Sequence, residues 1–167
     1  MTNNGNDDFS DSYLGKLRKK IGHDLVHVPG AGIVIEKFSG QLLLQKRRDF
    51  RVWDIPGGSP ENGEDTVEQA VRETYEETGL RAINPVPYGF ASHPKTQVIC
   101  YPNGDLCHFH DLLFFATEYE GNLIESNAET LAVDWFYPQD LPKVTAACTL
   151  NILAFLEFKK TGVFQII

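Results

Sequence analysis

Apolar residues recur along the chain with two different periods, and the change between them predicts a mixture of helices and strands. Recurrence at helical spacing predicts helices over residues 10–21, 64–78 and 146–158. Apolar, β-branched runs predict strands over residues 26–36, 41–46, 89–101, 105–119 and 131–137. These elements show no regular βαβ repeat, so the pattern favours an α+β or mixed αβα fold over a doubly wound parallel sheet.

Turn and capping residues mark the start and end of the central predicted helix. Residues 56–63 hold two prolines and three glycines, so we expect a loop there. Asp65 or Thr66 can cap the helix that follows, with a glutamate or glutamine three residues later, and Gly79 supplies its stop. The sequence therefore predicts a glycine-rich loop that leads directly into a well-defined helix.

A second turn signal concerns the cysteines. Asn103-Gly104 lies between two predicted strands and predicts a two-residue hairpin turn, which would place Cys100 directly opposite Cys107. Directly opposed residues lie within disulfide range. The chain has three cysteines, an odd and low count that is typical of a reducing compartment. Free thiols are therefore expected, with a Cys100–Cys107 disulfide as the alternative.

The length of 167 residues and the near-average composition indicate one globular domain. We expect a flexible N-terminal tail over residues 1–8 and a single domain over residues 9–167, because the first residues are polar and acidic. Such a start is unlike a secretory signal peptide, and no apolar run approaches the ~20 residues of a membrane-spanning helix. These features predict a cytoplasmic protein with no membrane partner.

The chain carries a formal net charge of -8. An acidic surface repels phosphate backbones, so nucleic-acid polymers are disfavoured as partners. A small anionic ligand stays compatible with this charge if a bound cation offsets the charge of the ligand.

The helix predicted over residues 64–78 carries a dense acidic face. At 100° per residue, Glu73, Glu76 and Glu77 share one narrow face of the helix. A separate face is suited to packing and holds Val67, Ala70, Val71, Thr74 and Thr78. Clustered carboxylates beside a glycine-rich loop suit a hard cation such as Mg²⁺, which prefers oxygen ligands. The alternative is a solvated surface face, which is the usual state of a charge run.

The spacing of this segment resembles the signature of the Nudix hydrolase family. The Nudix box is Gly-x5-Glu-x7-Arg-Glu-U-x-Glu-Glu-x-Gly-U, where U is a bulky aliphatic residue. The matching residues here are Gly58, Glu64, Arg72, Glu73, Glu76, Glu77, Gly79 and Leu80. Residues 53–58, Trp135-Phe136 and Leu141-Pro142 resemble common flanks of the box. Thr74 departs from the pattern at the first aliphatic position, where it should weaken core packing slightly without touching a carboxylate.

The resemblance implies a Nudix-like αβα sandwich with a mixed β-sheet and a metal-dependent pyrophosphohydrolase activity. Such an enzyme cleaves a nucleoside diphosphate linked to another moiety, for example a nucleoside triphosphate or an ADP-ribose-like compound, with Mg²⁺ or Mn²⁺ as cofactor. By similarity the metal ligands would be Glu73, Glu76, Glu77 and the carbonyl of Gly58, while Glu64 and Arg72 would orient them. A homodimer is also a possible assembly, since dimers are common among proteins similar to this one.

The alternative function is a catalytically silent Nudix-scaffold module that binds nucleotides or regulates a partner. Such a module should show lesions in the box. The four box glutamates, Glu64, Glu73, Glu76 and Glu77, are all present. Their presence favours the enzyme.

The general base has two sequence candidates outside the box. Glu129 precedes Trp135 by six residues, and this placement resembles the loop glutamate that some Nudix enzymes use. Glu125 is the rival for the same role, a box glutamate is a further alternative, and either loop acid is equally compatible with a plain surface position.

Substrate contacts are expected from the end of the second strand. Arg47 and Arg48 could hold phosphates, and Trp53 could stack on a base, although solvated and core positions are the alternatives. His108 and His110 alternate along a predicted strand and share a face, but the histidines and cysteines form no recognisable zinc spacing.

Overall fold

The structure, a computed structural model, describes residue 10 and residues 12–167, so the tail expected over residues 1–8 lies outside the described part. Its helices are α1 (Tyr13–Ile21), α2 (Thr66–Thr78), α3 (Pro94–Gln97) and α4 (Ala146–Thr161). Its strands are β1 (Val26–Ile35), β2 (Leu42–Arg47), β3 (Trp53–Asp54), β4 (Gly57–Gly58), β5 (Leu80–Ile83), β6 (Val86–Ala91), β7 (Val98–Cys100), β8 (Leu106–Ala116), β9 (Glu118–Gly121), β10 (Thr130–Phe136) and β11 (Gln165–Ile166). Within the described chain, no helix combines the length and apolarity needed to cross a membrane.

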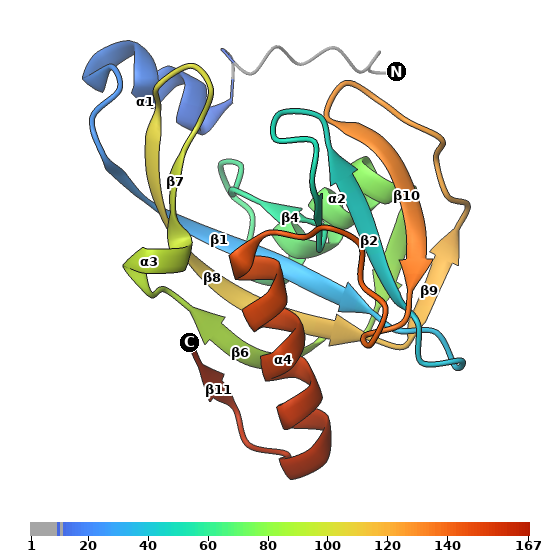
Figure 1. Ribbon diagram of the computed structural model, residues 1–167. Coiled ribbons are helices and arrows are strands. Elements are labelled where there is room, and N and C mark those ends of the chain that lie inside the picture. Colours follow the sequence, from blue (N-terminus) through green and yellow to red (C-terminus); the bar gives the residue numbers. More distant parts are fainter. Residues whose placement is uncertain (1–9, 11) are drawn as a thin grey trace.

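A mixed sheet forms the centre of the molecule (Figure 1). Its strand order is β11-β6-β8-β1-β4, and β7 also pairs with β8. β1 and β8 run parallel along their whole paired length, from Val26 opposite Cys107 to Ile35 opposite Ala116. β10, β2 and β3 form a second sheet, and β5 pairs with β9. This arrangement confirms the α+β sandwich with a mixed sheet.

Helices cover both faces of the central sheet, which explains why β1 reads as one continuous apolar run. Alternate residues of a strand point to opposite faces. Val34 packs into a cluster with Phe155 of α4, whereas Ile33 and Ile35 pack into a cluster with Ala70 of α2. In Figure 1, α4 lies in front of the sheet and α2 lies behind it.

Helix α2 follows the sequence prediction closely. The Asp65 carboxylate accepts hydrogen bonds from the backbone N–H groups of Val67 and Glu68, and Glu68 completes the capping box. Gly79 ends the helix with a positive φ of 79°. Thr74 is buried, and its hydroxyl donates to the carbonyl oxygen of Ala70 at 2.7 Å. The polar atom of this unusual box residue is therefore satisfied inside the helix.

The prediction of which residues of α2 pack against the core is partly wrong. Ala70, Thr74 and Thr78 are fully buried as expected, but Val67 is 41% exposed. Val67 lies in the first turn of α2 and lines a surface pocket with Val71, Tyr75 and Arg81. The first turn of α2 therefore extends beyond the surface it packs on.

The strand predicted over residues 89–101 is wrong, because it breaks into β6, α3 and β7. Pro94 stands at the first turn of α3, where its missing N–H costs nothing, and the side chain of His93 caps the helix. A local helix start therefore interrupts the extended segment.

The two-residue hairpin turn is also wrong by one residue. Cys100 pairs with Leu106, and Ile99 pairs with Cys107. The N–H of Gly104 donates to the carbonyl oxygen of Tyr101 at 2.9 Å, so Pro102 takes the second position of the turn. Proline favours that position because its φ is preset, whereas a paired strand position would need the N–H that it lacks. Cys107 is buried in a cluster with Leu14 and Val28, Cys100 is exposed, and all three cysteines are free thiols.

Candidate functional site

The glycine-rich segment before α2 contains a short strand where only a loop was expected. β4 pairs with β1, with Gly57 opposite Gly32 and Gly58 opposite Ala31. A Cβ atom on Gly57 would collide with the carbonyl oxygen of Ala31, and one on Gly58 would collide with the carboxyl group of Glu73. Glycine is therefore required at Gly57, where the clash is with backbone, while a side chain at Gly58 would displace the carboxyl group of Glu73; the two glycines bring the backbone of β4 against the acidic face of α2.

Glu77 lies under this strand and is held by two donors. The side-chain amide of Gln45 donates to its Oε1 at 3.0 Å, and the backbone N–H of Gly57 donates to its Oε2 at 2.9 Å. Burial raises the pKa of Glu77 well above its ordinary value, and the nearby Glu73 raises it further. The carboxyl group is therefore fixed in position, and its negatively charged form is disfavoured in the absence of a cation.

Glu73 occupies the adjacent position on the same face. Burial raises the pKa of Glu73 to about 7, Arg72 lowers it, and the negative charges of Glu76 and Glu129 raise it. Glu129 also raises the pKa of Glu77. The structure thus brings the predicted loop acid Glu129 into electrostatic range of two box glutamates.

Arg72 connects the start of α2 with its acidic face. Its guanidinium makes a two-pronged contact with the carboxylate of Glu64, at 2.6 and 3.0 Å, and it lies 2.9 Å from Glu76 and 3.1 Å from Glu73. It also donates to the carbonyl oxygen of Ser59 at 3.0 Å. The hydrogen bond from Arg72 lowers the pKa of Glu64. One cation therefore serves several carboxylates and ties the glycine-rich segment to the helix.

Two glutamines of the site escaped the sequence analysis. Gln69 donates to the carbonyl oxygen of Gly58 at 2.6 Å, and Gln45 donates to Glu77. Gln69 stands four residues before Glu73, so its position on the acidic face was a readable signal. No local signal identified Gln45, because β2 reaches the helix only through the fold.

The loop that carries Glu129 is anchored by Asn127. The side-chain oxygen of Asn127 accepts hydrogen bonds from the backbone N–H groups of Glu129 and Thr130, at 2.8 and 2.7 Å. Its amide nitrogen donates to the carbonyl oxygen of Glu76 at 2.7 Å. Arg48 donates to the carbonyl oxygen of Asn127 at 2.8 Å. Arg48, expected to contact phosphates, thus ties this loop to the end of β2, while Asn127 ties it to α2.

Arg47 and Trp53 also have partners within the protein. The guanidinium of Arg47 contacts the carboxylate of Asp49 at 2.6 Å and lies 5.3 Å from the ring centroid of Phe50. Trp53 packs edge-on against Phe136, with ring centroids 4.8 Å apart. Contact of Arg47, Arg48 or Trp53 with a ligand stays a prediction.

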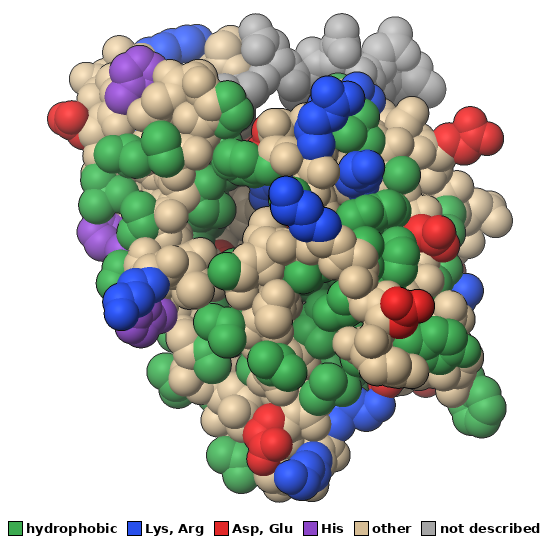
Figure 2. All heavy atoms as spheres, viewed as in Figure 1, with side chains coloured by type: hydrophobic (Ala, Val, Ile, Leu, Met, Phe, Trp, Pro, Cys, Tyr) green, Lys and Arg blue, Asp and Glu red, His purple; other side chains and the backbone are tan. Residues whose placement is uncertain are grey.

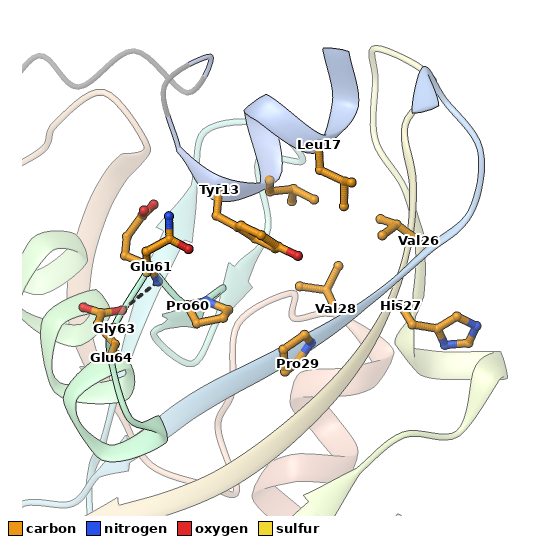
Figure 3. Close-up of a pocket in the computed structure, with 12 residues that line it drawn as sticks. Tyr13, Leu17, Val26, His27, Val28, Pro29, Pro60, Glu61, Gly63 and Glu64 are labelled. Atoms are coloured by element: carbon orange, nitrogen blue, oxygen red, sulfur yellow. Dashed lines mark hydrogen bonds between the residues drawn. The ribbon is translucent and has the colours of Figure 1, made fainter. Parts of the chain in front are cut away.

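A groove adjoins the box. It has a volume of about 310 Å³, and its lining includes Tyr13, Leu17 and Val28 on one side and Pro60, Glu61 and Glu64 on the other (Figure 3). This volume is at the lower end of the range for small-molecule sites. Figure 2 shows that one face of the molecule is hollowed beside a group of Lys and Arg side chains, although the protein is acidic overall.

The arrangement fits a divalent cation. Burial raises the pKa values of Glu73 and Glu77, and the negative charge of Glu129 raises both further. Arg72 lowers the pKa of Glu73 and Arg47 lowers that of Glu77, but both values stay raised. A hard cation prefers such oxygen donors, and it would replace the protons that the raised pKa values retain. The neighbouring carbonyl of Gly58, in the strand position paired with Ala31, accepts a hydrogen bond from Gln69.

Comparison with known proteins agrees with this geometry. The family model described as "NUDIX domain" matches residues 26–154. A provisionally named 8-oxo-dGTP diphosphatase of Bacillus subtilis (strain 168) is 36% identical over 70% of this chain and 71% of its own length. The crystal structure of a MutT NUDIX hydrolase from Burkholderia pseudomallei has a TM-score of 0.65 at 24% identity, covering 77% of this chain and 98% of that one. An ADP-ribose pyrophosphatase from Streptococcus suis has a TM-score of 0.65 at 18% identity, covering 84% and 98%.

Proposed function

Because the chain belongs to the NUDIX family and is a hydrolase of that family, we propose that it cleaves a phosphoric anhydride in a nucleoside diphosphate that is linked to another moiety. The observation that carries this proposal is the convergence of Glu73 and Glu77 against the backbone of Gly57 and Gly58, within electrostatic range of Glu129. A diphosphate is strongly negative, so an acidic site can hold it only through cations.

The proposed cofactor is Mg²⁺ or Mn²⁺, held by Glu73, Glu76, Glu77 and the carbonyl of Gly58. Such a cation would neutralise charge on the diphosphate and polarise the attacking water. The protein supplies the geometry. Gln45 and the N–H of Gly57 fix the two oxygens of Glu77, while Gln69 fixes the carbonyl of Gly58.

Arg72 is proposed to hold the ligand set in place rather than to contact the substrate. It binds Glu64 through two hydrogen bonds and reaches Glu73 and Glu76 from the same guanidinium. Release of Glu76 by Arg72 would free a carboxylate for a cation, since the side chain of Glu76 is 56% exposed. Glu64 would keep Arg72 in position during that exchange.

Glu129 is the proposed general base. Its loop is held by Asn127, yet the residue itself is exposed, so its carboxylate can meet a water that enters from solvent. Its charge also acts on Glu73 and Glu77, which places the base close to the proposed ligands. Glu125 lies on the same loop and is exposed, but Asn127 does not fix its backbone in the same way.

Nucleoside triphosphates are the substrate class that we favour. The relative of Bacillus subtilis named for 8-oxo-dGTP shares 36% identity with this chain. The groove beside Glu64 offers apolar contacts from Tyr13, Leu17 and Val28 for the nucleoside part. In this proposal the diphosphate lies against α2 and the base enters the groove.

A substrate screen tests the proposal. Purified protein is incubated with nucleoside triphosphates including 8-oxo-dGTP, ADP-ribose, dinucleoside polyphosphates and nucleotide sugars, each with Mg²⁺ or Mn²⁺. Product release is followed in ¹⁸O-labelled water, because the labelled product identifies the phosphorus that water attacks. We expect rapid hydrolysis of a nucleoside triphosphate and none after chelation of the metal. Nucleotide binding without turnover of any compound would instead support the silent module, and turnover that survives chelation would contradict the metal site.

A further inference from the structure

A histidine cluster lies on the central sheet, away from the box. His27 stands in β1 and His108 directly opposite it in β8, while His110 follows two residues later on the same face of β8. One ring nitrogen of each histidine lies within 4.8 Å of those of the other two. The sequence analysis paired His108 with His110 but missed His27, because the pairing of β1 with β8 creates the third position.

The cluster is close to the spacing of a metal site. The ring centroids of His108 and His110 are 4.4 Å apart, and those of His27 and His108 are 4.9 Å apart. Nδ1 of His27 lies 2.9 Å from Nε2 of His110. Tetrahedral ligation with metal–nitrogen bonds of 2.0–2.1 Å requires nitrogens about 3.3 Å apart, so the rings would rotate to bring nitrogens that lie within 4.8 Å of one another to that spacing.

The surroundings of His108 suit a ligand. Its Nε2 lies 2.8 Å from the carbonyl oxygen of Ser92. A carbonyl can only accept, so Nε2 carries the proton and Nδ1 keeps its lone pair. Metal-binding histidines commonly use their second nitrogen in this way, which fixes the ring.

The cluster is distinct from the carboxylate site. His27 precedes Ala31, the strand partner of Gly58, by four residues, or about 13 Å of extended strand. Its face of β1 is also opposite to that of Val28, which packs with Leu14 of α1, and in Figure 3 the imidazole points away from Tyr13 and Leu17. Nitrogen donors select a different class of ion from the carboxylates of α2.

We propose that His27, His108 and His110 form a second metal site, which takes a divalent transition-metal ion of the Zn²⁺ class and leaves one coordination position open to solvent. His27 is exposed, so an ion can enter without opening the fold. Three neutral imidazoles and one free position are a common ligand set for Zn²⁺. Without metal, the hydrogen bond between His27 and His110 holds the side chains close to their ligating positions.

Cobalt titration of the tag-free protein tests this site. Tetrahedral Co²⁺ with nitrogen ligands absorbs visible light far more strongly than octahedral Co²⁺ with oxygen ligands, so the spectrum separates the two sites. Mg²⁺ is kept in excess to occupy the carboxylates. We expect one equivalent of strongly absorbing Co²⁺, which Zn²⁺ displaces, and a thermal midpoint that rises with Zn²⁺.

The variants His27→Gln and His110→Gln should each weaken Co²⁺ binding by roughly tenfold or more and abolish the Zn²⁺-dependent rise of the midpoint. His23→Asn is the matched control, because His23 is exposed and lies outside the cluster. Glu77→Gln should keep the strong absorption, so failure of the proposed hydrolase site would leave this result intact. No strong absorption in the wild type, unchanged binding in His27→Gln, or equal loss in His23→Asn would overturn the proposal. His27→Gln replaces an exposed side chain, so its midpoint without metal also verifies folding.

Discussion

The acidic face of α2 and the histidine cluster of β1 and β8 are two groups of metal-binding side chains with opposite origins. Glu73, Glu76 and Glu77 meet because one helix repeats every 3.6 residues. His27 and His108 meet although 81 residues of sequence separate them, because two strands run parallel in one register. The first group can be recognised in the sequence, whereas the second exists only in the folded chain.

The two regions also differ in how their charge is managed. On α2, Arg72 and Gln45 hold acids that would otherwise repel one another. On the sheet, the imidazoles of His27 and His110 stack and share a hydrogen bond at 2.9 Å, and the cluster consists of histidines alone. The carboxylates of α2 therefore repel one another, and a bound cation would relieve that repulsion. The histidine region instead offers nitrogen lone pairs, which select a transition-metal ion rather than Mg²⁺.

The largest expected effect is that of Glu77→Gln, which removes one buried charge but retains the shape. We expect kcat/KM to fall roughly 100-fold, or about 2.7 kcal/mol in the transition state, because a ligand of the proposed cation is lost. Steady-state kinetics at varied Mg²⁺ measures this change. Glu157→Gln is the control, since Glu157 lies on α4 with a half-exposed side chain. A decrease in kcat/KM of less than about tenfold would show that Glu77 is not a ligand of a catalytic cation, and α2 would then not be a metal site comparable with the histidine cluster.

Glu129→Gln should slow turnover by about tenfold to 100-fold while Mg²⁺ affinity changes little, since we assign proton transfer to this residue. Glu125→Gln on the same loop should leave the rate nearly unchanged. Single-turnover kinetics with a separate Mg²⁺ titration distinguishes the two variants. Equal rates for wild type and Glu129→Gln would return the role of base to a box glutamate.

The pKa of Glu73 predicts how Mg²⁺ affinity depends on pH, and metal binding at the histidine site should follow a different pH profile. Because burial raises this pKa to about 7, a cation must displace a proton from Glu73 at lower pH. Mg²⁺ affinity should therefore fall by about tenfold for each pH unit below 7. Isothermal titration in buffers of different ionisation enthalpy measures both the affinity and the released proton. Proton release that is unchanged in Glu73→Gln would contradict the assignment.

The same shift predicts the stability of the metal-free protein. The pKa of Glu73 is raised from 4.5 in the unfolded chain to about 7 in the folded one, so the folded state binds its proton more tightly. This contribution is complete below pH 4.5 and is lost as the pH rises through about 7. Thermal midpoints in a chelator should decline less over this interval for Glu73→Gln than for the wild type.

Arg72→Lys should destabilise the protein by about 1 kcal/mol, because an ammonium group cannot reproduce the two-pronged contact with Glu64. Urea denaturation measures the loss. Arg81→Lys is a suitable control, since its guanidinium lies on the exposed side over Tyr75. An unchanged unfolding midpoint for Arg72→Lys would show that Arg72 contributes charge alone.

The smallest effect concerns the sheet and its register. One thiol per chain should react quickly with a thiol reagent under native conditions, namely Cys100, while Cys107 and Cys148 react only after unfolding. Mass spectrometry of the labelled peptides identifies the site. Rapid labelling of Cys107 would contradict its burial against Leu14 of α1, and slow labelling of Cys100 would contradict the exposed position that it has in β7.

The sequence was most informative where structure depends on neighbours along the chain. The limits of α2, its capping box and the glycine stop are local events, and the structure confirms them. The sequence was misleading at the hairpin between β7 and β8, where two local signals compete. Asn103-Gly104 favours a two-residue turn, but Pro102 shifts the turn by one residue because proline has no N–H to donate to a strand.

The sequence by itself determined the family, the mixed fold and the acidic helix, because a helix places its side chains by residue spacing alone. Only the tertiary structure decided that Gln45 would hold Glu77, that Asn127 would fix the loop of Glu129, and that His27 would join His108. These contacts depend on which strands pair and in which register, and the long-range burial of both sheet faces selects that pairing.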